Sequence, residues 1–95
     1  MTEANQLNNK RMASLYKAIA KIRTKNEAAN FLRDLCTLEE LEEMSRRWQA
    51  AEMLNQGKPY REIAKLTGLS TTTVTRVAYW FNYGKGGYKL ILKRK

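Results

Sequence analysis

Residues 60–77, YREIAKLTGLSTTTVTRV, decide the fold of this chain. Apolar side chains recur at helical spacing on both sides of Gly68, which can adopt a positive φ where a helix ends. Ser70 is a preferred N-cap for a second helix, and the small Ala64 permits close contact between helices. The stretch therefore predicts a helix-turn-helix, with two short helices that meet at a steep angle. The side chains expected in their shared core are Ile63, Leu66, Val74 and Val77.

The outward face of the second helix carries polar and aromatic side chains that suit a nucleic acid. A helix-turn-helix motif normally places its second helix in the DNA major groove. Threonine hydroxyls can donate or accept at base edges, and the helix N-terminus can bind phosphate through its N–H groups. Two roles stay open, since Thr73 could be structural and Tyr79 could pack at an interface. The candidate DNA-binding residues of this helix are Ser70, Thr71, Thr72, Thr73, Thr75, Arg76 and Tyr79.

The positive charge of the chain is concentrated toward its C-terminus. The net charge is +9 over 95 residues. Residues 1–56 carry nine Lys and Arg against eight Asp and Glu, whereas residues 57–95 carry nine Lys and Arg against the single acid Glu62. Such asymmetry is typical of a protein that binds a polyanion; a merely soluble basic protein is the alternative. The lysines expected to add affinity for phosphate are Lys58, Lys65, Lys85 and Lys89.

The sequence lacks residues that enzymes and metal sites commonly use. The chain has no histidine, which is the commonest general base and metal ligand, and Cys36 is its single cysteine. The N-terminal segment is polar, and no apolar run approaches the roughly 20 residues that cross a bilayer. We therefore expect a cytoplasmic protein that is not an enzyme, binds no metal or other cofactor and does not enter membranes.

Helical periodicity extends over nearly the whole chain. Thr37 and Glu40 form a T-x-x-E capping box that opens a long helix. Gly57 is expected to end that helix, and Pro59 suits the first turn of the next. A single domain is expected over residues 1–95, since no long linker or repeat divides it. The expected helices cover about residues 8–24, 26–35, 37–56, 59–67 and 71–82, followed by a basic helix or a frayed tail over 83–95.

The apolar faces of the first two expected helices exceed what one slender helix-turn-helix domain can cover. Exposed stripes of this kind usually mark a partner, and helix-turn-helix proteins usually bind two DNA half-sites as dimers. We therefore predict a homodimer, with a compact monomeric bundle as the alternative. In this division residues 1–56 supply the dimerisation helices, residues 57–82 the helix-turn-helix, and residues 83–95 the basic C-terminal helix or tail.

Four blocks of the sequence carry a resemblance to a known family. They are LCTLEELEEMSRRWQAAEML at residues 35–54, REIAKLTG at 61–68, TTVTR at 72–76 and NYGKGGYKLIL at 82–92. The first three resemble the central helix, the first motif helix and the recognition helix of the Trp repressor family. The last is similar to the tail of its YerC/YecD branch of TrpR-like proteins. The resemblance implies an all-α, intertwined homodimer that binds operator DNA, and it matches Arg61 to a base-contacting arginine suited to guanine.

The resemblance also concerns a small-molecule site. In tryptophan-responsive members two arginines enclose the indole ring of the corepressor, and they match Arg47 and Arg76; a corepressor-contacting threonine matches Thr37. Val77 stands where those members have glycine and Trp80 where they have serine, so both changes add bulk to the ligand cavity. The implied effector set is thus Thr37, Arg47 and Arg76, with phosphate contact or surface solvation as the alternative for the arginines. We expect no response to tryptophan.

Taken together, these features favour a repressor-like transcriptional regulator that binds double-stranded DNA as a homodimer and does not respond to tryptophan. Either it needs no small-molecule effector, or the effector is smaller than tryptophan or binds elsewhere. Two alternatives differ in kind. One is a helix-turn-helix subunit of a transposase or recombination system, although no catalytic carboxylate domain follows and no leucine zipper is apparent. The other is a protein- or RNA-binding adaptor that directs its basic face at another polyanion.

Overall fold

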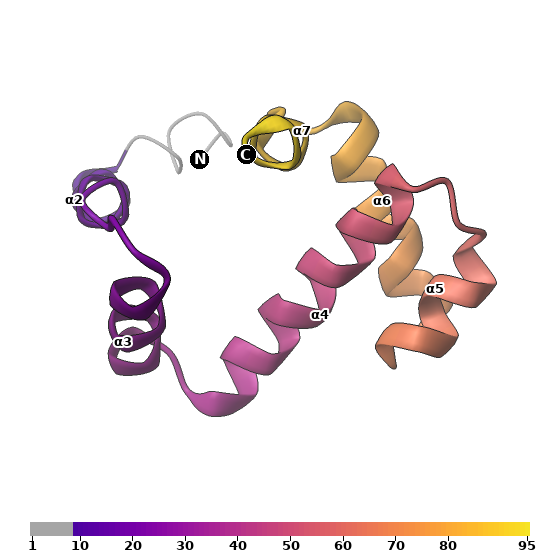
Figure 1. The fold of residues 1–95 in the computed structure, drawn as a ribbon, viewed down its shortest axis with the longest axis horizontal. Coiled ribbons are helices and arrows are strands. Elements are labelled where there is room, and N and C mark those ends of the chain that lie inside the picture. Colours follow the sequence, from indigo (N-terminus) through magenta and orange to yellow (C-terminus); the bar gives the residue numbers. More distant parts are fainter. Residues whose placement is uncertain (1–8) are drawn as a thin grey trace. The chain divides into compact units, whose positions relative to one another are not determined.

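A computed structural model describes residues 9–95, and this range consists of helices joined by short turns, without a strand. The chain divides between Cys36 and Thr37 into two compact units, of which the first contains α2 and α3 and the second α4 to α7. The expected all-α class is confirmed. The helices, labelled in Figure 1, are α2 (Lys10–Ile19), α3 (Lys25–Leu35), α4 (Leu38–Asn55), α5 (Tyr60–Thr67), α6 (Thr71–Tyr83) and α7 (Gly87–Lys93).

The first unit contains two short helices, each with a side-chain cap at its N-terminus. Asn9 caps α2, since its Oδ1 accepts a backbone N–H at 2.8 Å. Thr24 caps α3, since its hydroxyl accepts from the Glu27 N–H at 3.1 Å. The helix expected to run to residue 24 instead ends at Ile19, and Thr24 caps the helix that follows. Its expected start at residue 8 lies outside the described residues.

Neither helix of the first unit buries a residue within the single chain. A helix of 10 or 11 residues is marginal by itself in water, because most helical stability comes from the packing of an apolar face. The apolar faces of α2 and α3 therefore remain available for further contacts. The large apolar side chains that they leave exposed are Met12, Tyr16, Ile19 and Leu35.

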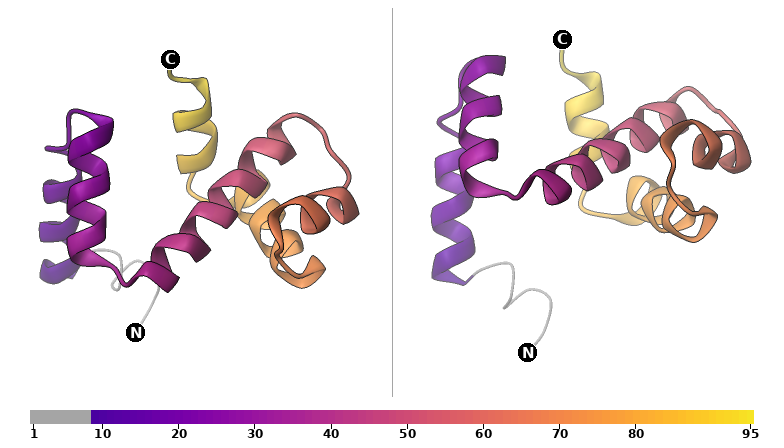
Figure 2. Two further views of the ribbon diagram at one scale, coloured as in Figure 1. Left: turned by 60° about the horizontal axis from the view of Figure 1, so that its bottom comes forward. Right: turned by 90° about the horizontal axis from the view of Figure 1, so that it is seen from below.

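The second unit closes a small core around α4. Ala50 and Ala51 of α4 are fully buried, and their small side chains let α5 and α6 approach the α4 backbone. Figure 2 shows α5, α6 and α7 arranged along the C-terminal part of α4. Burial of these side chains removes apolar surface from water and so stabilises the unit. The buried cluster consists of Ala50, Ala51, Ile63, Leu69, Val74 and Val77.

The expected capping box opens α4. The Thr37 hydroxyl accepts from the Glu40 N–H at 3.1 Å, and the Glu40 carboxylate accepts from the Thr37 N–H at 2.8 Å. The hydrogen bond from the Thr37 backbone, followed by that from its side chain, lowers the pKa of Glu40 below its ordinary value. A charged carboxylate is also favourable at this positive end of the helix. At the other end Gly57 follows α4 with φ +80°, as expected.

The turn between α5 and α6 has the predicted backbone, with Gly68 at φ +78°. Thr67 is buried, and its hydroxyl donates to the Ile63 carbonyl at 2.7 Å and accepts from the Leu69 N–H at 3.2 Å. The expectation for Leu66 was wrong, because this side chain is 52% exposed. Since α5 directs its Ile63 and Thr67 side toward α4, Leu66 is turned about 100° away from Thr67 and out of the core.

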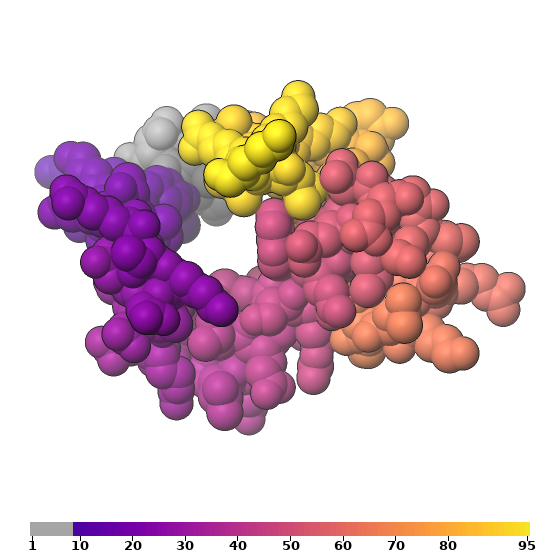
Figure 3. Space-filling view, viewed as in Figure 1, coloured from indigo at the N-terminus to yellow at the C-terminus, as the bar shows by residue number. Residues whose placement is uncertain are grey.

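The C-terminal segment forms helix α7 rather than a frayed tail. The ring of Tyr88 stacks on that of Trp48 in α4, with centroids 6.2 Å apart and planes inclined by 30°. Figure 3 shows the α7 segment (yellow) against α4. The turn that leads into α7 depends on Gly84, whose N–H donates to the Trp80 carbonyl at 2.9 Å. A Cβ at Gly84 would collide with that same carbonyl.

Candidate nucleic-acid interface

The exposed face of α6 lies opposite the face that enters the core. Val74, Val77 and Ala78 are buried, and each residue of a helix is turned about 100° from the one before it. The predicted groove-facing residues therefore lie on the outer side of the second unit, while Thr73 is half-buried at the edge. The exposed members of the predicted set are Ser70, Thr71, Thr72, Thr75, Arg76 and Tyr79.

Hydrogen bonds within the chain occupy some hydroxyl groups at α6 and leave others free to bind a ligand. Ser70 caps the helix, since its Oγ accepts from the Thr73 N–H at 3.1 Å and donates to Thr73 Oγ1 at 3.0 Å. Thr75 Oγ1 donates its proton to the Thr71 carbonyl at 2.9 Å, so only its lone pairs and its methyl remain for a ligand. In the described part of the chain no such bond occupies the Thr72 hydroxyl. Thr72 can therefore both donate and accept.

Three predicted phosphate-binding or base-contacting cations lie in or next to α5. Arg61 and Lys65 belong to the helix, and their surroundings differ from those of Lys58, which precedes it. Arg61 and Lys65 are exposed and four residues apart, so they lie on one side of α5. Lys58, at the turn before α5, instead has its Nζ 3.8 Å from Glu62 Oε1. Because Glu62 partly neutralises Lys58, the predicted phosphate contact of Lys58 has less free charge than those of Arg61 and Lys65.

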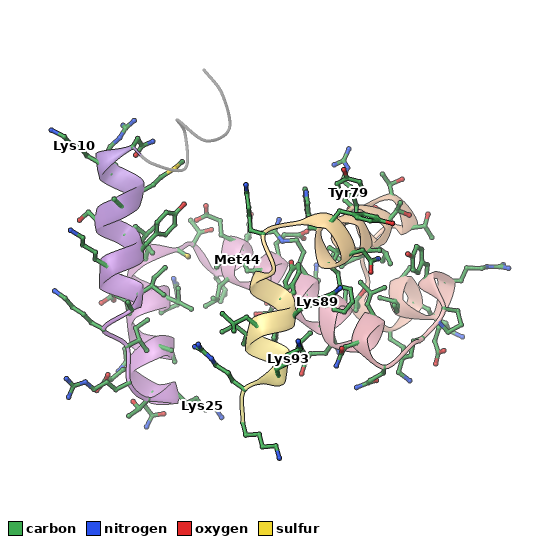
Figure 4. The ribbon with its side chains drawn as sticks, turned by 90° about the horizontal axis from the view of Figure 1, so that it is seen from above. Lys10, Lys25, Met44, Tyr79, Lys89 and Lys93 are labelled. Atoms are coloured by element: carbon green, nitrogen blue, oxygen red, sulfur yellow. The ribbon has the colours of Figure 1, made fainter. Side chains whose placement is uncertain are left out.

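The two C-terminal lysines of the predicted set differ in position. Lys85 is exposed in the turn after α6. The Lys89 Nζ lies 5.3 Å from the centroid of the Phe81 ring, a cation–π contact. Phe81 packs against the core and is turned about 200° from Tyr79 along α6. Lys89 is therefore on the side of α6 away from Tyr79, as Figure 4 shows.

The chain matches a known protein family over most of its length. The family model of the Trp repressor protein matches residues 10–95. The chain belongs to the Trp repressor family. This confirms the resemblance predicted from the sequence, and the family and its fold indicate a DNA-binding regulator rather than an enzyme.

Individual Trp repressor family relatives agree with this assignment. The uncharacterised protein YerC of Bacillus subtilis is 34% identical over 92 residues, which cover 97% of this chain and 88% of YerC. The crystal structure of a TrpR-like protein from Eubacterium eligens has a TM-score of 0.88 and 37% identity, with 95% of this chain and 93% of that chain covered. A candidate Trp repressor from Staphylococcus aureus has a TM-score of 0.88 and 33% identity, with coverages of 99% and 94%. The TrpR-like fold is thereby established.

Two of the predicted effector residues of this Trp repressor family member, Thr37 and Arg47, lie apart along α4 within one chain. Thr37 uses its hydroxyl as the acceptor that caps α4. Arg47 lies ten residues further along the sequence, hence about 15 Å along the helix axis, and it is half-buried. Val77 is fully buried in the core, whereas Trp80 is 49% exposed. Among the described residues no cation–π contact joins Trp80 to the arginine one turn before it.

Sequence reasoning missed Tyr83 as part of the exposed face of α6. Tyr83 is 75% exposed, and its ring lies 5.3 Å from that of Tyr79, centroid to centroid, with an angle of 52° between the planes. The signal was present, since Thr72, Arg76, Tyr79 and Tyr83 follow one another at helical spacing. It was overlooked because the helix was expected to end at residue 82.

Two further findings concern other kinds of site. Within residues 9–95 no group of three or more His, Cys, Asp or Glu side chains is arranged to hold a metal ion. Over the same range, no helix combines the length and apolar character that a crossing of a membrane would need.

Proposed function

We propose that this protein is a sequence-specific, repressor-like transcriptional regulator that binds operator DNA as a homodimer through α6. The observation that carries the proposal is the coincidence of two features in one segment. The exposed side of α6 presents hydroxyl and guanidinium groups, and residues 63–95 contain seven Lys and Arg but no Asp or Glu. Such a segment attracts phosphate over its whole length and offers groove-reading groups on one helix.

The available hydroxyls suggest how sequence would be read. Thr72 can donate and accept at a base edge, whereas Thr75 offers a methyl suited to thymine and lone pairs for a base amino group. Arg76 and Arg61 have fork-shaped guanidinium groups, and Arg61 is our candidate for bidentate contact with guanine O6 and N7. Ser70 and Thr73 are committed to the cap, so we assign them to positioning the helix N-terminus against a phosphate.

The homodimer is supported by the first unit. Helices α2 and α3 bury no residue in a single chain but expose apolar side chains that include Tyr16 and Ile19. A second copy would cover these faces and would also supply a second α6, which two-fold operator sites require. The preferred site should then be a near-palindrome with half-site centres about 34–36 Å apart, or a multiple of that distance.

The test measures the affinity for duplex DNA at several salt concentrations and compares wild type with the Arg61→Ala variant. A homodimer with about 6–10 phosphate contacts should lose about 10³–10⁵ in affinity between 50 and 200 mM salt. Arg61→Ala should relax the selected consensus at one base pair and cost roughly 1–3 kcal/mol there. Lys17→Ala in α2, which also removes one exposed cation, should leave the consensus unchanged. A flat salt dependence, or tighter binding to RNA than to the selected duplex, would count against DNA regulation.

We further propose that DNA binding does not need L-tryptophan. The support is Val77, which fills core space where tryptophan-responsive members have glycine, together with the bulk of Trp80. A ligand shifts a conformational equilibrium only if it binds one state better than the other. Calorimetry should detect no L-tryptophan binding at micromolar concentration, and the duplex affinity should not change with the amino acid. A gain of about tenfold in affinity would contradict the steric argument.

A further inference from the structure

The last two tyrosines of α6 form an exposed aromatic pair whose role the groove-reading residues do not explain. Tyr79 is 61% exposed and Tyr83 75%. Large aromatic rings usually lie in a core or an interface, so this exposure is unusual. Their rings pack on each other at 5.3 Å and 52°, so each restrains the other. In the described residues no hydrogen bond within the chain engages either hydroxyl.

The position of the pair relates it to the DNA surface. Tyr79 and Tyr83 lie seven and eleven residues after Thr72, which is about 10.5 and 16.5 Å along the helix axis, and all three belong to the same side of α6. The major groove is only about 12 Å wide. If the N-terminal half of α6 lies in the groove, Tyr79 lies near its edge and Tyr83 beyond it, where the sugar-phosphate backbone runs. This step rests on the proposed function.

The charge around the pair favours a polyanion over other occupants. Tyr79 and Tyr83 lie between Arg76 and Lys85, in the segment that has no acidic residue after Glu62. A second copy of the same segment would bring like charges together, which opposes self-association through this face. A phosphate backbone has the opposite charge and accepts hydrogen bonds, and a tyrosine hydroxyl can donate one.

We propose that Tyr79 and Tyr83 together bind the phosphate backbone of duplex DNA just outside the base pairs read by α6. Each phenolic O–H donates to a phosphate oxygen, and the ring pair holds the two hydroxyls in place. The contact does not depend on base sequence. Because the phenol is neutral, the contact adds affinity without releasing a counterion, unlike the contact of a lysine.

The experiment compares Tyr79→Phe, Tyr83→Phe and the double variant with wild type on one operator duplex at several salt concentrations. The rings remain, so only the hydroxyls are removed. The double variant should bind about tenfold or more weakly at every salt concentration, because hydrogen bonds to charged groups are broken, while the salt slope stays unchanged. Lys85→Gln is the matched control and should reduce the slope by about 0.9, the value for one phosphate that is no longer neutralised. Tyr16→Phe in α2 controls for the removal of a hydroxyl elsewhere.

Several results would overturn the proposal. Unchanged affinity of the double variant, with wild-type helicity and mass, would show that the hydroxyls do not bind phosphate. A loss confined to operators with one particular base pair would indicate base reading instead. Tighter binding to single-stranded DNA that survives both Phe changes would indicate a platform for stacking bases. Failure of the wild type to bind any duplex would overturn the proposed function itself. This outcome differs from failure of the tyrosine proposal, because it is seen with the wild type alone.

Discussion

The two units of this chain obtain their stability in different ways. The unit of α4 to α7 contains fully buried side chains from three helices, including Ala51, Ile63 and Val74. The unit of α2 and α3 contains capped helices with amphipathic patterns, yet none of its described residues is buried. Helix-forming sequence is therefore common to both, but only one unit has a core of its own. The difference agrees with the proposal that α6 of one unit binds DNA and that the other unit is completed by a second copy.

The net positive charge does not follow this division, although the acid-free segment does. Residues 1–36 carry seven Lys and Arg against three Asp and Glu, and residues 37–95 carry eleven against six, so both units are positively charged. The acid-free segment 63–95 lies entirely in the unit that has its own core, because the acids of that unit belong to α4 and to Glu62. A helix that must lie on DNA needs a rigid support, because misplacement of its side chains weakens every contact.

The largest expected effect is on the core of the second unit. Ile63→Ala removes a fully buried side chain of α5 and should lower the free energy of unfolding by about 2–5 kcal/mol, measured by urea denaturation. Leu66→Ala in the same helix is the matched control, and should change it by no more than about 0.5 kcal/mol because Leu66 is exposed. A comparable cost at both positions would mean that Leu66 is covered in the assembled protein.

The next prediction concerns the apolar face of the first unit. Ile19→Glu places a charge among side chains that we expect to lie in the dimer interface, and should weaken dimerisation by about 1–3 kcal/mol, or roughly 5- to 150-fold. Ser14→Glu adds the same charge to the other side of α2 and should leave the dimer intact. Light scattering over a dilution series measures both. If the Ile19 variant stays dimeric to the same dilution as wild type, α2 is not part of the interface.

A smaller effect is expected at the turn that attaches α7 to the second unit. Gly84→Ala brings a Cβ against the Trp80 carbonyl, and relief through bond-angle distortion should cost about 1 kcal/mol. Gly87 is the first residue of α7, and a Cβ added there would meet no atom within 4 Å. Gly87→Ala should therefore be neutral or slightly stabilising. Thermal unfolding of the two variants provides the comparison. Equal melting temperatures would argue against the close approach of the chain at Gly84.

The smallest expected effect is a pH dependence at the start of α4. Hydrogen bonding lowers the pKa of Glu40 in the folded protein, so its stabilising contribution is complete above the pKa of the unfolded chain. The contribution is lost as the pH falls through the folded pKa. Glu40→Gln keeps an acceptor for the capping box but does not titrate. Unfolding of wild type should therefore respond slightly more steeply to acidification than that of the variant, and identical pH profiles would refute this.

Many boundaries of the helices could be predicted because their signals are local. The capping box of Thr37, the positive φ of Gly68 and the cap of Ser70 each depend on residues no more than four positions away. The start of α3 is marked by the same kind of local signal at Thr24, whereas the end of α2 is not. The apolar spacing that continues to Ile22 predicted a longer first helix than the structure has.

The sequence by itself determined the all-α class, the family, the position of the helix-turn-helix and the charge of its surface, since these follow from short-range pattern and composition. Tertiary structure decided which apolar residues are covered: Val77 is buried and Leu66 is exposed, although both lie at helical spacing in the motif. It also directed Lys89 to the Phe81 ring and paired Tyr83 with Tyr79. Such choices depend on which helices come together in space, and spacing along one helix does not contain that information.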